Sequence, residues 1–81
     1  MFTPGHSSDS VTYYFEEEKV MMVGDFVFYR SIGRTDLETG SMREMQKSIE
    51  RLKQYPDDIT LYPGHGPRTL LGSEKRENLY F

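Results

Sequence analysis

The chain has 81 residues, a formal net charge of −3, four prolines, seven glycines and no cysteine. This length predicts one small globular unit near the lower range at which a hydrophobic core is self-sufficient, and the lack of cysteine excludes disulfides and thiolate metal ligands. No apolar run approaches the roughly 20 residues of a membrane span, and no signal peptide is visible. Because the chain is acidic overall and its basic residues are scattered, we expect no nucleic-acid partner. We also expect no membrane partner and a cytoplasmic location.

The N-terminal part of the chain predicts a β-hairpin. Residues 10–15 are rich in β-branched and aromatic types, and Val20–Val23 is a short apolar run. The charged run Glu16–Lys19 between them is typical of a solvent-exposed turn. Phe26–Tyr29 is expected to extend the same sheet, and residues 31–40 follow as a long polar loop.

The C-terminal part predicts a helix and then a further strand. Ser41 and Glu44 have the spacing of a capping box, in which each side chain bonds to the other residue's backbone N–H. A core-facing stripe at helical spacing follows, formed by Met42, Met45, Ile49 and Leu52. Pro56–Asp58 ends the helical region, and Ile59–Tyr62 returns as a strand.

Both histidines of the chain follow a Pro-Gly pair, as His6 and His65. Proline fixes φ and glycine permits turns that other residues resist, so each histidine is expected on a rigid loop. Asp25 comes directly after the apolar run, and loops that follow strands often carry functional side chains. Since imidazole and carboxylate groups bind zinc, iron or manganese, these three residues are candidate metal ligands. Taken singly, each histidine has a plain alternative as a solvated side chain.

Four stretches resemble, in order and spacing, the later motifs of the metallo-β-lactamase-fold hydrolases, and most of all the short glyoxalase II-like (hydroxyacylglutathione hydrolase-like) thioesterases. They are Thr3–Ser7, Gly24–Phe28, Ser31–Asp36 and Tyr62–Pro67. The resemblance implies that His6 binds one metal ion, Asp25 bridges two ions and His65 binds the second. Zinc is the implied metal, with iron or manganese as alternatives. The family's His-X-His-X-Asp-His motif, which supplies two ligands to each ion, does not occur in this sequence.

The resemblance also implies a fold. We expect a layered α/β (α+β) structure: residues 1–76 as the C-terminal half of an αββα sandwich, with a mostly antiparallel or mixed sheet and one main helix. Residues 77–81 spell most of a protease-cleavage tag, yet Asn78 also matches a Glu-Lys-X-X-Asn pattern of relatives, so this segment is a tag remnant or a native tail. A half-sandwich leaves sheet surface uncovered, which predicts a homo-oligomer or binding to the missing N-terminal half.

Three function classes follow. The first is a fragment of a metal-dependent thioester hydrolase, inactive alone because the other ligand motif is missing. The second is a non-catalytic half-domain that forms homodimers and binds metal weakly. The third is a relative of mononuclear iron oxygenases, because two histidines and one carboxylate are a known iron ligand set.

Other residues have both a functional and a structural interpretation. Arg34 and Asp36 lie in the loop after Asp25 and either line the site or form an ion pair that pins the loop, which we favour. The strand tyrosines either contact substrate or pack against the sheet, the more common role; they are Tyr13, Tyr14 and Tyr62.

Overall fold

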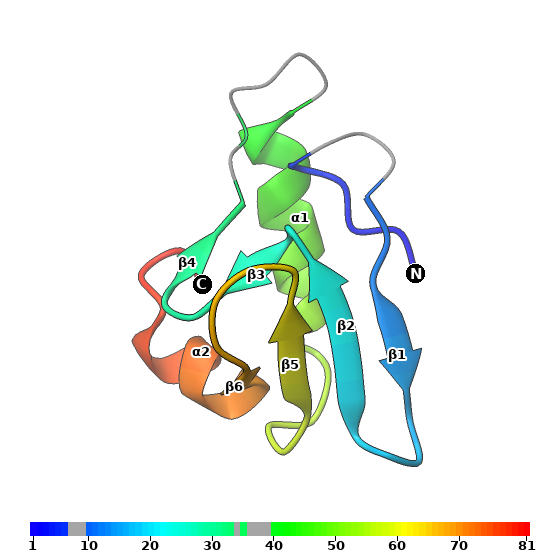
Figure 1. Ribbon diagram of the computed structural model, residues 1–81. Coiled ribbons are helices and arrows are strands. Elements are labelled where there is room, and N and C mark those ends of the chain that lie inside the picture. Colours follow the sequence, from blue (N-terminus) through cyan, green and yellow to red (C-terminus); the bar gives the residue numbers. More distant parts are fainter. Residues whose placement is uncertain (7–9, 34, 36–39) are drawn as a thin grey trace.

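The computed structural model describes residues 1–6, 10–33, 35 and 40–81 (Figure 1). Arg34, Asp36 and much of the predicted polar loop lie outside the described residues. The described strands and helices are β1 (Tyr13–Phe15), β2 (Val20–Gly24), β3 (Val27–Phe28), β4 (Ser31–Ile32), α1 (Met42–Leu52), β5 (Thr60–Pro63), β6 (Thr69–Leu70) and α2 (Leu71–Glu77).

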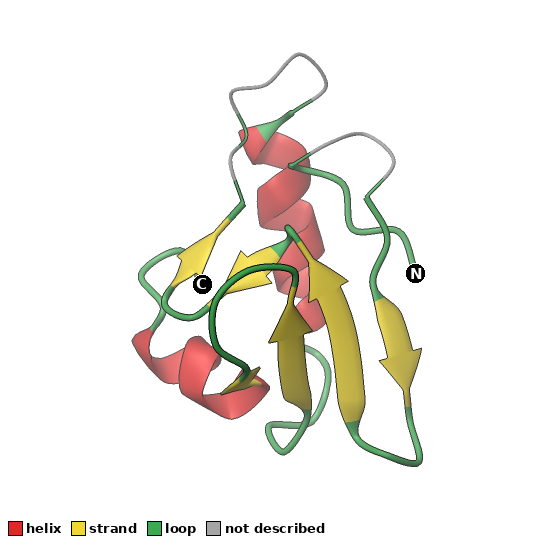
Figure 2. Ribbon diagram, in the orientation of Figure 1, coloured by secondary structure: helices red, strands yellow, loops and turns green. Residues whose placement is uncertain are grey.

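One layer of the molecule is a four-stranded sheet in the order β1-β2-β5-β6, and α1 lies behind it (Figures 1 and 2). β1 and β2 pair antiparallel with Tyr14 opposite Met21, which confirms the predicted hairpin. β2 and β5 run parallel with Met21 opposite Leu61, and β5 pairs antiparallel with β6. The sheet is therefore mixed and the fold is layered α/β, as the sequence predicted.

The strand predicted after Asp25 does not extend this sheet. β3 pairs instead with β4 in a separate two-stranded sheet, with Val27 opposite Ile32. Tyr29 and Arg30 form the turn between them, and Arg30 has a φ of 59°. The sequence pattern missed this hairpin because neither turn residue is one of the usual glycine, asparagine or proline turn formers.

The hydrophobic core lies between α1 and the sheet. Met45, Ile49 and Leu52 of α1 have no exposed surface, as the helical stripe predicted. Met42 was expected in the same stripe, but it is 46% exposed because it is the first residue of the helix and lies at the margin of the core. The remaining buried apolar residues are Met21, Val23, Phe26, Val27, Ile59, Leu61 and Leu71.

Only half of the predicted capping box forms. The Ser41 hydroxyl accepts a hydrogen bond from the Glu44 N–H at 3.2 Å, as predicted. The Ser41 N–H donates to the carbonyl oxygen of Gly5 at 2.7 Å, rather than to the Glu44 carboxylate. A backbone acceptor has replaced the side-chain acceptor, and it comes from the segment just before His6.

β6 and the short helix α2 were not predicted. The carboxylate of Glu74 in α2 is fully buried and accepts hydrogen bonds on both oxygens. Oε1 accepts from the Arg30 N–H at 2.8 Å and from Asn78 Nδ2 at 2.9 Å. Oε2 accepts from the Arg30 guanidinium and from the Thr69 hydroxyl, the latter at 2.7 Å. This network ties α2 to both sheets, while the division at residues 76 and 77 stays a prediction.

Candidate metal centre

Two of the candidate ligands lie at one edge of the sheet, because the parallel strands β2 and β5 both end there. Asp25 directly follows β2, and His65 lies two residues beyond β5. The Gly64 N–H donates to the Gly24 carbonyl at 2.9 Å, which joins the two loops. The register of β2 against β5 shifts just before Gly24, and such irregularities commonly redirect the side chain that follows.

His6 reaches the same place from the N-terminal segment. Its Nε2 lies 3.5 Å from Asp25 Oδ2, and His65 Nδ1 lies 3.2 Å from Asp25 Oδ1. Each histidine therefore faces a different oxygen of one carboxylate. The structure brings together the three residues that the sequence proposed as ligands, with Asp25 in the middle.

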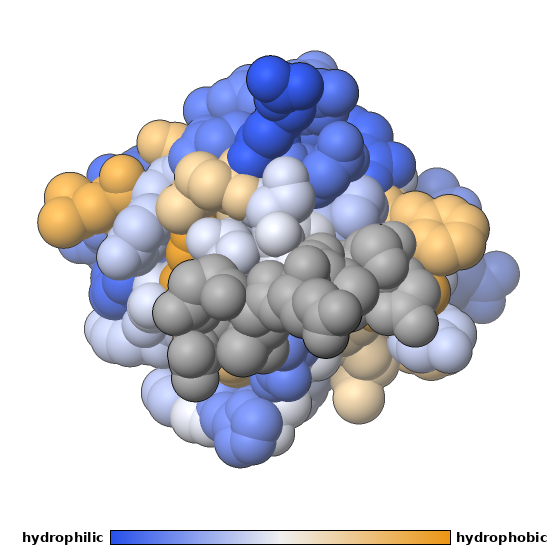
Figure 3. Space-filling model, turned by 90° about the horizontal axis from the view of Figure 1, so that it is seen from above, coloured by the Kyte–Doolittle hydropathy of each residue, from blue (hydrophilic) through white to orange (hydrophobic). Residues whose placement is uncertain are grey.

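The centre is open to solvent on one side. The His6 side chain is 23% exposed, that of Asp25 41% and that of His65 81%. The ring of Phe28 packs edge-on against the His65 ring, with centroids 6.1 Å apart, and this contact helps to orient an otherwise exposed imidazole. Seen from above, the surface around the residues drawn in grey is largely hydrophilic, with small hydrophobic patches at its margins (Figure 3).

Gly33 is a site residue to which the sequence analysis gave no role of its own. It is buried, and its N–H donates to the Phe26 carbonyl at 3.1 Å. A Cβ at this position would lie 1.8 Å from the Asp25 carbonyl oxygen and 3.2 Å from the His6 Cβ. Only glycine lets the chain after β4 pass this close to both candidate ligands. Its place in one of the four motifs was the available signal.

The strand tyrosines divide between the two faces of the sheet. Tyr14 packs edge-on against Tyr55 at 5.2 Å and contacts the core, which confirms the packing interpretation for this residue. Tyr13 and Tyr62 lie on the opposite face, which α1 does not cover, and both are exposed.

One of the two separations in the centre is that of ligands that share a metal ion, and it is also that of a hydrogen bond. Two ligand atoms about 2.1 Å from a zinc ion, at angles of about 90–109°, lie roughly 2.9–3.4 Å apart. The His65–Asp25 separation of 3.2 Å falls in this range, and the His6–Asp25 separation of 3.5 Å lies just beyond it. Within the described part of the chain, no three or more His, Cys, Asp and Glu side chains are grouped so that together they could hold one ion. Asp25 is common to two pairs of candidate ligands, one with each histidine.

Comparison with known proteins identifies the family. Residues 1–65 match the metallo-beta-lactamase superfamily, and the chain belongs to it. The chain is 39% identical over 80 residues to a probable metallo-hydrolase of Streptococcus pyogenes, covering 98% of this chain and 34% of that protein. It is 42% identical over 77 residues to the hydroxyacylglutathione hydrolase GloC of Haemophilus influenzae, covering 93% and 36%. The crystal structure of TTHA1623 in a di-iron-bound form superposes with a TM-score of 0.97 at 37% identity, covering 100% and 41%.

These matches confirm the predicted family and the fold, and a hydroxyacylglutathione hydrolase is among the relatives. They also show that the chain spans only about a third of the length of the curated relatives, at 34% and 36% in the two cases above. No helix among the described ranges is long and apolar enough to cross a membrane.

Proposed function

We propose that this chain carries one side of a two-metal centre that hydrolyses thioesters. The observation that carries the proposal is the position of Asp25 between the two histidines, one at each carboxylate oxygen. His6 would hold one ion, His65 the other, and Asp25 would bridge them. Zinc suits this set of imidazole and carboxylate donors, and the di-iron-bound form of TTHA1623 supports iron as an alternative.

When bound, such ions supply Lewis acidity, which polarises a carbonyl group and makes water a better nucleophile. The residues of this chain contribute placement and charge. Asp25 would supply negative charge to both ions, and Phe28 and Asp25 contact the exposed His65 ring and help to orient it. The exposed His65 side leaves room for a carbonyl substrate to approach. The similarity to a hydroxyacylglutathione hydrolase supports a thioester as that substrate, and a cytoplasmic location is part of the same proposal.

The isolated chain is expected to have little or no activity, because an open zinc site usually needs about three protein ligands per ion. The test uses S-lactoylglutathione with zinc, manganese or iron, and compares the chain alone with a chimera. In the chimera, the chain replaces the matching 36% of the Haemophilus protein. We expect turnover by the chimera, its loss in Asp25→Ala, and none by the chain alone. Robust turnover by the chain alone, or a folded, metal-loaded chimera without turnover, would contradict the proposal.

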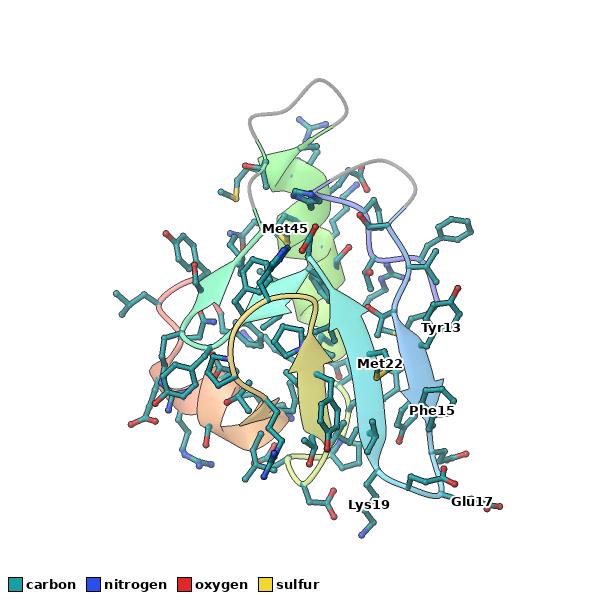
Figure 4. All side chains as sticks on the ribbon, in the orientation of Figure 1. Tyr13, Phe15, Glu17, Lys19, Met22 and Met45 are labelled. Carbon is teal, nitrogen blue, oxygen red and sulfur yellow. The ribbon has the colours of Figure 1, made fainter. Side chains whose placement is uncertain are left out.

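A second candidate function is assembly through the uncovered sheet face. Four large side chains are exposed on this face: Tyr13, Phe15, Met22 and Tyr62. Figure 4 labels Tyr13 and Phe15 on β1 and Met22 on β2, and it shows Met45 separately, on α1. Tyr13 is opposite Met22 in register, and Met22 is opposite Tyr62, so three large side chains form one row. A groove of about 350 Å³ lies among them, and apolar, tyrosine and glycine residues line it.

We propose a second copy of this chain as the occupant of that face. The residues that line the groove carry no charge, so two copies can meet there without repulsion between like charges. Sheets in sandwiches pack face to face with their strands nearly aligned, and a twofold axis lets one surface serve both partners. Burial of the row formed by Tyr13, Met22 and Tyr62 would supply the driving force.

A further inference from the structure

The segment that leads to His6, residues 2–5, lies along α1 and forms three hydrogen bonds with it. In each bond the donor belongs to the helix or its N-cap, and the acceptor is a backbone carbonyl of the segment. The pairs are the Ser41 N–H with Gly5 at 2.7 Å, the Ser48 hydroxyl with Pro4 at 2.8 Å, and the Arg51 guanidinium with Phe2. The residue numbers of the donors increase along the helix while those of the acceptors decrease, so the segment runs antiparallel to the helix.

The segment and the helix are in direct backbone contact. A Cβ at Gly5 would lie 2.6 Å from the Cα of Met45, so no side chain separates the two at this point. Residues 1–3 of the segment also pair with residues 10–12, through the Phe2–Val11 bridge and the Thr3 N–H bond to the Ser10 carbonyl. Pro4 and Gly5, which directly precede His6, contact α1 instead. The seating of these two residues on α1 therefore helps to set the position of His6 relative to Asp25.

We infer that Ser48 is a positioning residue for His6. It is fully buried, alongside the apolar residues Met45, Ile49 and Leu52 of the same helix. Helical serines often bond back to the carbonyl four residues earlier, but this hydroxyl donates across to Pro4. A buried hydroxyl without an acceptor costs folding free energy. The Ser48 hydroxyl therefore favours the position of the segment in which the Pro4 carbonyl accepts its hydrogen bond. That seating places His6 Nε2 at 3.5 Å from Asp25.

The test is Ser48→Ala, studied by NMR on the 81-residue chain with a chelator present so that no metal contributes. The hydrogen exchange of the Ser41 amide reports whether the segment stays on the helix, because that amide donates to Gly5. We expect this exchange to accelerate about fivefold, which is the effect that the loss of roughly one hydrogen bond has on an opening equilibrium. We expect the ring signals of His6 to shift, while those of His65 stay in place.

Thr69→Val is the matched control, because it also removes one hydroxyl hydrogen bond from a buried residue, but at Glu74 of α2. It should leave the Ser41 amide and the His6 ring unchanged. Ser48→Thr keeps a hydroxyl on the same carbon and should retain wild-type values. The inference is overturned if Ser48→Ala behaves like the Thr69 variant, or if Ser48→Thr is perturbed as strongly as Ser48→Ala.

The inference gives Ser48 a role in the proposed metal centre, so a zinc titration against a competing chelator forms a separate arm. We expect Ser48→Ala to weaken zinc binding about tenfold, the usual lower bound for losing a residue that orients a ligand. If the chimera with the Haemophilus protein also binds no zinc, the proposed function fails, but the metal-free NMR comparison still decides the role of Ser48. Equal zinc affinity in the wild type, Ser48→Ala and Thr69→Val would contradict the inference.

Discussion

Glu74 shows how a single buried charge is stabilised in so small a molecule. Its carboxylate accepts from the Arg30 backbone and guanidinium, the Thr69 hydroxyl and the Asn78 amide. Glu74→Gln would place an amide N–H₂ group among these donors and leave the Arg30 charge without its buried partner. We expect a loss of about 3 kcal/mol in the free energy of unfolding, measured by urea denaturation.

Glu77→Gln is the control for this prediction, because Glu77 pairs with the same Arg30 but its side chain is 61% exposed. An exposed ion pair of this kind contributes little, so its loss should cost less than about 1 kcal/mol. Equal, small losses in the two variants would show that the buried network does not stabilise the fold as described.

The ion pair of Lys19 and Asp58 gives a pH dependence at the other end of the sheet. The hydrogen bond that Lys19 donates at 2.8 Å holds the pKa of the Asp58 carboxyl below its ordinary value. A lowered pKa in the folded state stabilises the fold above the unfolded value of about 3.9, and this contribution is lost as the pH falls through the folded value. Asp58→Asn should therefore flatten the dependence of the melting temperature on pH below about 4. An unchanged acid slope would mean that the pair has no effect.

The three candidate ligands could be proposed from the sequence because local signals mark them: Pro-Gly before each histidine, and a strand end before Asp25. Gly33 and Ser48 could not be recognised in this way. The role of Gly33 follows from its approach to Asp25, and that of Ser48 from a bond to Pro4, which is 44 residues away in sequence. Contacts of this range leave no trace in local periodicity.

The contact between the His6 segment and α1 is sensitive to added volume. Gly5→Ala would put a methyl group 2.6 Å from the Met45 backbone, at a φ of 148°. We expect a loss of about 2–4 kcal/mol, the sum of overpacking and backbone strain. Gly66→Ala is the comparison, because its φ of 79° is also unfavourable for alanine but no atom lies within 4 Å of the added carbon. It should cost about 1–2 kcal/mol. If urea unfolding gives similar losses for both, the close contact at Gly5 is not a constraint.

The elements with strong local patterns were predicted, and those fixed by tertiary contacts were not. The first hairpin alternates between the two faces of the sheet, and α1 has a capping serine and a core-facing stripe, so both were found. β3 was found, but its pairing with β4 was not, because Tyr29 and Arg30 carry no turn signal. α2 has only seven residues, too few for an amphipathic period to stand out.

At the scale of the whole molecule, the uncovered sheet face makes self-association the expected state. Met22 lies in the middle of the exposed row, and Met22→Lys would put a charge where two copies meet. We expect the sedimentation coefficient of the wild-type chain to rise with concentration, and that of Met22→Lys to stay at the monomer value. Leu79→Lys is the control, because Leu79 is a highly exposed apolar residue outside the groove. A compact wild-type monomer at all concentrations would contradict the proposed dimer.

The central claim, that His6, Asp25 and His65 hold metal in this chain, is tested most directly by thermal unfolding with zinc and with chelator. A ligand that binds only the folded state raises the melting temperature once its free concentration exceeds the dissociation constant. For a chain of this size, a hundredfold excess should raise the melting temperature by about 10–20 °C. We expect that shift in the wild type and a much smaller one in His6→Ala and His65→Ala. Equal melting temperatures with zinc and with chelator in all three proteins would show that this chain does not form the site.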